Sequence, residues 1–110
     1  MKFMILANFL SKKYHWTKHA KEKMKHYGLS ASRLQRVFRC PDRREEGIAE
    51  NTTACMQRAG SKKHPYEVWM MYQIKIEIIN IISAWRYPGI SPVGGKVPVP
   101  EDIMRELGIE

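Results

Sequence analysis

Residues 76–87 read IEIINIISAWRY, a run dominated by isoleucine and aromatic side chains. β-Branched and aromatic residues of this kind favour β-strands. Residues 78–82 carry apolar side chains on both faces, which is typical of a central strand covered on both sides. The stretch therefore predicts an interior strand of a sheet with a packed layer on each face.

Three earlier segments complete the predicted sheet. Residues 66–73 (YEVWMMYQ) have a similar composition, and residues 44–49 and 53–58 resemble shorter strands around a turn at Glu50 and Asn51. The short connections favour an antiparallel meander, although residues 73–75 carry no turn signal. We therefore expect a mainly antiparallel four-stranded sheet.

Two helices are predicted before the sheet. Thr17 is placed to cap a helix over residues 18–27, and Gly28 is placed to end it. Ser30 is placed to cap a second helix over residues 31–39. The positions expected to be buried are Ala20, Met24 and Tyr27 in the first helix, and Leu34, Val37 and Phe38 in the second. The predicted fold is α+β, with both helices packed on the sheet.

The chain divides into one core and two flanking segments. We interpret residues 16–88 as the core domain and residues 1–15 as an apolar N-terminal extension. Residues 89–110 form a Pro/Gly-rich connector followed by a short helix over residues 101–107. The apolar run at residues 3–10 (FMILANFL) is far shorter than the about 20 residues of a membrane helix. Packing within the molecule is the favoured interpretation, with no stable membrane association.

Two cysteines, Cys40 and Cys55, form no Cys-x-x-Cys pair and cluster with no histidine. This pattern indicates neither a disulfide framework nor a structural zinc site, and the reducing cytoplasm is the simplest compartment. The sequence also contains no Gly-rich phosphate loop, nucleophile elbow or paired-carboxylate motif. We therefore expect neither a metal nor a cofactor.

Positive charge is concentrated in one third of the chain. Residues 12–44 hold eleven Lys or Arg against two acids, whereas the other 77 residues hold eight against nine. The net charge of +8 is thus +9 in this segment and −1 elsewhere. Such asymmetry indicates a surface that meets a polyanion. A solvated helical face that keeps the protein soluble is the alternative interpretation. The basic residues expected to contact nucleic acid are Lys18, Lys21, Lys25, Arg33, Arg36, Arg39 and Arg58.

His19, Lys23 and His26 share one face of the first predicted helix, at positions i, i+4 and i+7. A histidine or lysine beside a basic surface can transfer protons during RNA cleavage. A half-buried His19 bonded to the backbone is an equally good interpretation. No carboxylate or cysteine joins the two histidines at metal-ligand spacing.

The last predicted strand ends at Arg86 and Tyr87. Alternation predicts Ile82, Ala84 and Arg86 on one face, and Ser83, Trp85 and Tyr87 on the other. Arginine clamps a phosphate through paired donors, and a strand end would hold it rigidly. The alternatives are stacking on Trp69 or Trp85, or pairing with Glu67. The candidate catalytic residues are His19, Lys23, Arg86 and Tyr87.

Two stretches resemble a known family. Residues 17–30 (TKHAKEKMKHYGLS) are similar to the HA-x-x-R/K-M-x-x-x-G-I/L-S opening of a bacterial domain family grouped with BrnT-like toxins of the RelE-like superfamily. Residues 81–86 (IISAWR) are similar to the I-I-S-A-x-R last strand of BrnT-like proteins, with Trp85 where a small or basic residue is often found. The match spans about residues 16–88.

The resemblance implies a RelE/BrnT-like α+β fold with the helices on one sheet face. It also implies a metal-independent endoribonuclease toxin that acts on RNA, in some cases on the ribosome, and is neutralised by an acidic protein antitoxin. His19 and Arg86 are the motif positions that carry over, and Lys23 stands where the motif has a basic residue.

Two other functions remain open from the sequence. The two helices, joined through residues 27–29, have the length and tight turn of a DNA-binding helix-turn-helix, with Arg33, Arg36 and Arg39 along the exposed side of the second. The other is a non-enzymatic module whose basic face meets an acidic protein partner.

Overall fold

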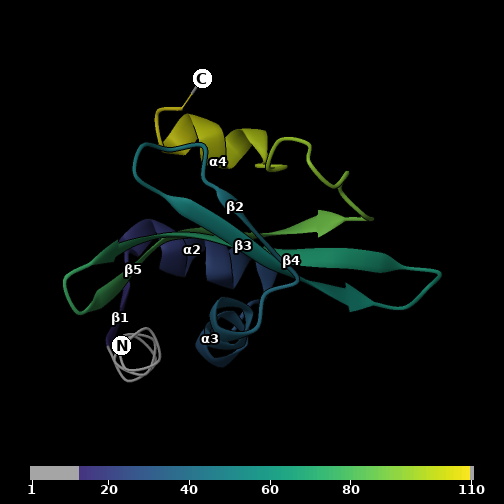
Figure 1. The fold of residues 1–110 in the computed structure, drawn as a ribbon, viewed down its shortest axis with the longest axis horizontal. Helices are drawn as coiled ribbons and strands as arrows, with labels where there is room; N and C mark the ends of the chain where they lie inside the picture. The colour runs from purple at the N-terminus through teal and green to yellow at the C-terminus, as the bar shows by residue number, and fades with distance from the viewer. Residues whose placement is uncertain (1–12, 110) are drawn as a thin grey trace.

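The computed structural model describes residues 13–109. Its elements are β1 (Lys13–Trp16), α2 (Lys18–Tyr27), α3 (Ala31–Arg39), β2 (Arg43–Glu46), β3 (Thr53–Gly60), β4 (Pro65–Lys75), β5 (Ile78–Pro88) and α4 (Glu101–Glu106). The strands form one sheet in the order β1-β5-β4-β3-β2 (Figure 1). The fold is α+β, and the apolar run at residues 3–10 lies outside the described residues.

The predicted four-stranded antiparallel sheet is wrong, because β1 adds a fifth strand that pairs parallel to β5. Tyr14 lies opposite Ile79, and His15 lies 2.8 Å from the side-chain oxygen of Asn80. The resulting mixed sheet does not fit the RelE-like arrangement that the resemblance implied. β1 has only four residues, which are too few to show a clear alternation. Its partner strand comes 65 positions later, so the local sequence does not predict the pairing.

The β4–β5 hairpin also differs from the expectation. β4 runs two residues beyond its predicted end, to Lys75, and β5 begins at Ile78, two residues later than predicted, so the chain reverses in a two-residue turn at Ile76 and Glu77. Glu77 has φ 64°, a left-handed conformation that Gly or Asn usually supplies. The sequence therefore lacks the usual turn signal at the point where the chain reverses.

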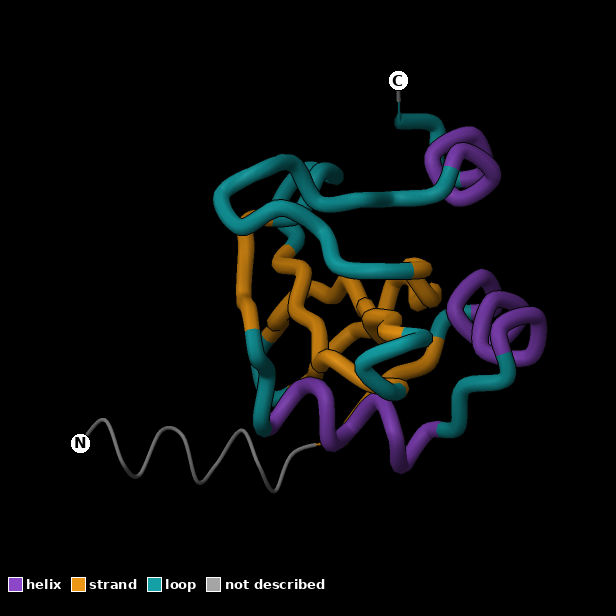
Figure 2. Tube along the Cα trace, turned by 90° about the vertical axis from the view of Figure 1, so that its right-hand side faces the viewer, coloured by secondary structure: helices purple, strands orange, loops and turns teal. Residues whose placement is uncertain are grey.

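The helices lie on different sides of the sheet (Figures 1 and 2). α3 covers one face, and α4 with the preceding connector covers the other. β1 pairs only with the first part of β5, up to Ile81. α2 lies along the remaining part, where His19 reaches Ser83 and the carbonyl of Tyr27 reaches Arg86. This position leaves α2 within reach of α4 as well as α3.

Both predicted helices have the predicted bounds and caps. The Thr17 hydroxyl accepts a hydrogen bond from the Ala20 N–H at 3.1 Å, and the Ser30 hydroxyl accepts one from the Arg33 N–H at 3.1 Å. Gly28 ends α2 with φ 67°. These caps satisfy N–H groups that the first turn leaves without helical partners.

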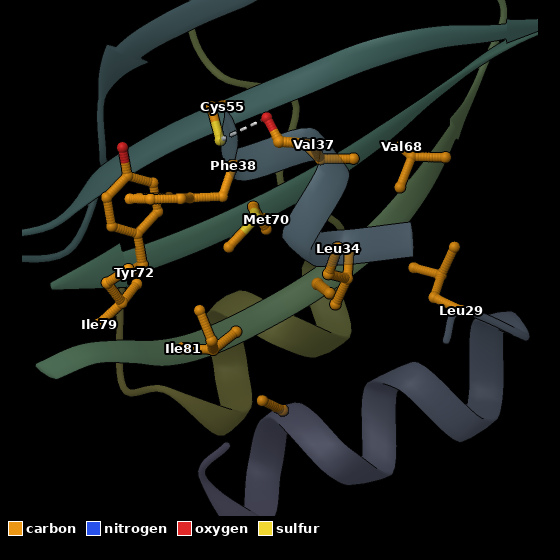
Figure 3. Packing of buried hydrophobic residues seen from close by; sticks show 12 residues of the cluster. Leu29, Leu34, Val37, Phe38, Cys55, Val68, Met70, Tyr72, Ile79 and Ile81 are labelled. Carbon is orange, nitrogen blue, oxygen red and sulfur yellow. Dashed lines mark hydrogen bonds between the residues drawn. The ribbon is translucent and has the colours of Figure 1, made fainter. Parts of the chain in front are cut away.

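The core on the α3 side joins that helix to the sheet (Figure 3). Leu34, Val37 and Phe38 are buried, as predicted, and pack with Met70 and Ile81. Burying each such side chain contributes about 1.5–3 kcal/mol. Because Leu34, Val37 and Phe38 face the sheet, the arginines of α3 are left on the outer side.

The opposite face of the sheet has its own core. The Trp69 and Trp85 rings are stacked with centroids 6.1 Å apart, and Val97 and Ile103 of the C-terminal segment pack over them. A bulge in β5 places Ile82 on this face, so the predicted grouping of Ile82 with Ala84 is wrong. An extra residue in one strand reverses the alternation beyond it, and alternation alone does not reveal a bulge.

A buried carboxylate fastens the C-terminal connector to this face. Glu67 is fully buried and accepts hydrogen bonds from the Ser91 N–H at 2.9 Å, the Ser91 hydroxyl at 2.6 Å and the Trp69 indole at 2.9 Å. Arg43 donates to the Ser91 hydroxyl at 2.8 Å. Glu67 is therefore committed to the connector and is not the partner of Arg86.

None of the helices within residues 13–109 has the length and apolar character needed to cross a bilayer.

Candidate nucleic-acid interface

Four arginines line one open groove beside α3. Arg33, Arg36 and Arg39 recur every three residues on the outer side of the helix, and Arg86 comes from the end of β5. The groove has a volume of about 470 Å³ and is completed by Gly28, Leu29, Ser30 and Ser32. We refer to these eight residues as the arginine groove. It unites three of the predicted nucleic-acid contacts with one predicted catalytic residue.

Arg86 is held in the groove by the end of α2. Its Nε donates to the Tyr27 carbonyl at 2.7 Å, and its Nη2 lies 3.3 Å from the Gly28 carbonyl. The guanidinium also stacks on Tyr66, with Cζ 4.9 Å from the ring centroid. The predicted alternatives, stacking on a tryptophan or pairing with Glu67, are both wrong, because those side chains lie on the other face. A guanidinium has five N–H donors, so Arg86 keeps donors for a ligand.

Among the described residues, no acidic side chain neutralises the charge of the groove. Within residues 13–109, the ion pairs of Arg and Lys join Lys23 to Asp102 and Glu106, and Arg43 to Glu45, and none includes a groove arginine. In the same described region, the buried Nε of Arg33 has no hydrogen-bond partner. The first turn of α3 adds N–H groups and the positive end of the helix dipole. Donors and positive charge of this kind suit an anion such as a phosphate.

His19 lies outside the groove, between α2 and α4. Its Nε2 is 2.9 Å from the Ser83 hydroxyl, and its Nδ1 is 3.7 Å from a carboxylate oxygen of Glu106. Burial lowers the pKa of His19 below its ordinary value of 6.5, and the nearby Glu106 only partly opposes this. The side chain is 19% exposed, so the half-buried interpretation is confirmed, with a serine side chain as the partner instead of the backbone.

Lys23 is held as a cation by α4. Its Nζ lies 2.7 Å from Asp102 and 2.7 Å from Glu106, and its side chain is only 9% exposed. The hydrogen bonds that Lys23 donates to these two carboxylates raise the pKa of Lys23. A lysine with a raised pKa keeps its proton, so this geometry does not suit a general base.

The predicted catalytic residues occupy separate places. Tyr87 packs on the face covered by α4, whereas Arg86 lies in the arginine groove on the α3 side. His19 and Lys23 both approach the carboxylate of Glu106 on α4, and neither lines the groove. The structure therefore brings together His19 and Lys23, but not with Arg86 or Tyr87.

The remaining predicted contacts lie outside the groove. Lys18, Lys21 and Lys25 are exposed on α2, and Arg58 is exposed on β3 with its N–H bonded to the Asp42 carboxylate at 2.7 Å. None of these four lines the groove. They add positive charge to the surface of the protein but do not line the arginine groove.

Two acidic residues were missed by reasoning from sequence. Asp102 and Glu106 are spaced i, i+4 on α4, which matches the i, i+4 spacing of His19 and Lys23 on α2. That complementary spacing is the signal that was available. Asp102 comes 79 positions after Lys23, so nothing local in the sequence connects the two pairs.

Among residues 13–109, no three His, Cys, Asp or Glu side chains are grouped so that they could hold a metal ion. Comparisons with protein-family models, with curated proteins and with solved structures found no match to this chain.

Proposed function

We propose that this protein binds RNA through the arginine groove. The observation that carries the proposal is the convergence of four guanidinium groups, unpaired with acids in the described chain, on one open hollow. Phosphate contacts supply most of the affinity for nucleic acid when sequence is not read. An unneutralised row of arginines supports this role better than a solvated face, which needs no hollow and no fixed Arg86.

Affinity for RNA should fall steeply with salt. Each phosphate neutralised on a single strand contributes about −0.7 to the slope of log K against log salt. Three to four arginine contacts therefore give a slope of about −2 to −3. Binding that does not respond to salt would contradict a phosphate-based interface.

The decisive test compares two double charge reversals of equal size. Arg36→Glu with Arg39→Glu alters the groove, and Lys62→Glu with Lys63→Glu alters the exposed β3–β4 loop. Anisotropy of a fluorescent twelve-nucleotide RNA should show at least about a tenfold loss for the groove pair and little loss for the loop pair. Equal losses would mean that net charge, and not the groove, determines binding.

A second candidate is metal-independent endoribonuclease activity of the toxin-antitoxin type. The favouring observation is His19, which burial keeps neutral near pH 7 and therefore able to accept a proton. In this candidate, His19 acts as the base, Arg86 holds the RNA in the arginine groove, and an acidic antitoxin protein neutralises the toxin. Lys23 is paired with Asp102 and Glu106, and Tyr87 lies on the α4 face, so neither has a role in this candidate.

Cleavage is tested with a labelled RNA in the presence of EDTA. Wild-type protein should cut the RNA, and His19→Ala and Arg86→Ala should lose the activity while remaining folded by circular dichroism. Induced expression should arrest growth only for the wild type. Intact RNA with the wild-type protein, or full activity of His19→Ala, would reject this second candidate.

A further inference from the structure

Two aromatic side chains of β1 lie side by side on the α3 side of the sheet. Tyr14 and Trp16 are two residues apart and share one face of the strand. Their rings are stacked with centroids 5.7 Å apart at an angle of 19°. Both side chains are only partly buried. β1 is an edge strand of the sheet, so the pair lies at the edge of this sheet face.

The aromatic pair adjoins the C-terminal end of α3. The Tyr14 ring packs edge-to-face against Phe38, with centroids 6.0 Å apart. Phe38 is followed by Arg39, the last arginine of the groove, and the positive charge of Arg39 partly offsets the rise that burial causes in the pKa of Tyr14. The row of arginines therefore leads toward stacked aromatic rings.

A polar atom of the pair also lacks a partner. The hydroxyl of Tyr14 is buried and makes no hydrogen bond within the residues that the structure describes. Buried polar groups are nearly always bonded, so an unpaired one marks a place where a ligand can supply the partner. The unpaired Nε of Arg33 at the start of α3 is a second atom of this kind.

The dimensions suit a short piece of a nucleic-acid strand. Arg33 and Arg39 are six residues apart, which is about 9 Å along a helix. Stacked nucleotides advance by about 3.4 Å each, so the row spans two to three nucleotides. A base following the last of these phosphates would arrive at the aromatic pair.

We propose that the ligand of the arginine groove is single-stranded nucleic acid, with phosphates on Arg33, Arg36 and Arg39 and a base stacked on Trp16. A positively charged track with an aromatic platform is the general device of single-strand binding, because every base has a stacking face. A duplex hides those faces between its own base pairs. This inference rests on the proposed function and specifies which form of nucleic acid is bound.

Tryptophan fluorescence provides a direct test. The chain has three tryptophans, and Trp69 and Trp85 are completely buried, so an arriving base can stack only on Trp16. The wild-type protein is titrated with a twelve-nucleotide uridine RNA, with the same RNA paired to its adenosine complement, and with inorganic polyphosphate. Quenching is expected with the single strand alone.

Two substitutions separate stacking from charge. Trp16→Phe keeps an aromatic face and should bind the single strand about as well as the wild type by anisotropy. Trp16→Leu should weaken binding by about 5- to 150-fold, the range for loss of one stacked base, with an unchanged salt slope. If Trp16→Leu does not fold, the presence or absence of quenching in the wild type still decides the question.

The outcomes discriminate between the two proposals. Binding of the single strand without quenching, equal quenching by polyphosphate, or binding of the paired RNA with equal affinity overturns the single-strand inference and leaves nucleic-acid binding by the groove in place. Failure to bind every nucleic acid tested overturns both.

Discussion

The ammonium group of Lys23 lies 2.7 Å from the carboxylate of Asp102, a residue 79 positions later in the chain. The second carboxylate on the same lysine is that of Glu106, which also approaches His19. These contacts join α4 to α2 across the edge of the sheet. Lys23 and His19, which the sequence suggested for catalysis, thus hold the C-terminal helix in place.

Removing one partner of this anchor should destabilise the fold. Asp102→Asn leaves the largely buried Lys23 with one carboxylate fewer, and we expect unfolding free energy to fall by about 1–2 kcal/mol, because Asp102 itself is partly exposed and screened. Urea unfolding measures this. Glu101→Gln, an exposed position of the same helix, is the control and should change stability by less than about 0.5 kcal/mol. An equal effect of both substitutions would mean that the ion pair is not the anchor.

Stability should decrease as the pH is lowered from neutrality. Burial lowers the pKa of folded His19 below its ordinary 6.5, so the unfolded chain takes up the proton first. The contribution of neutral His19 is therefore complete above pH 6.5 and is lost as the pH falls from there toward the folded pKa. His19→Gln removes the titrating group and should flatten the curve between pH 7 and 5. Parallel curves for the two proteins would show that other groups cause the dependence.

The connector should loosen when its buried anchor is removed. Ser91→Ala deletes the hydroxyl that donates to Glu67 at 2.6 Å and accepts from Arg43 at 2.8 Å. A buried carboxylate that loses a donor costs about 1–3 kcal/mol. Hydrogen exchange of residues 91–107 should accelerate, with little change in α3. The neighbouring Ile90→Ala, at a residue 65% exposed and directed to solvent, is the matched control and should leave exchange unaltered.

Gly28 should resist replacement because of its backbone, not its surroundings. Its φ of 67° is strained for residues with a Cβ, while a Cβ there would meet only the Arg86 Nη2, at 4.0 Å. Gly28→Ala should lower stability by about 1 kcal/mol, and Gly28→Asn by less, since asparagine tolerates this region. Thermal unfolding distinguishes them. If alanine and asparagine are equally harmful, conformational strain is not the cause.

Local features of the sequence were sufficient for both long helices. Thr17, Gly28 and Ser30 act on atoms within three or four residues, and a buried stripe such as Leu34–Val37–Phe38 repeats within two turns. The α+β class and four of the strands followed from composition and alternation. The basic segment was visible as an excess of charge, since counting needs no coordinates.

The tertiary structure alone decided which of these residues meet. β1 found a parallel partner 65 positions away, a bulge moved Ile82 to the opposite face, and α4 supplied the carboxylates of Lys23. Such pairings depend on the path of the whole backbone, which cannot be predicted from the alternation or spacing of residues in the sequence. The sequence by itself therefore determined the basic segment and the two capped helices, because both depend on neighbouring residues. Only the fold separated His19 and Lys23 from Arg86 and placed Tyr14 and Trp16 beyond the arginines of α3, because these positions depend on long-range packing.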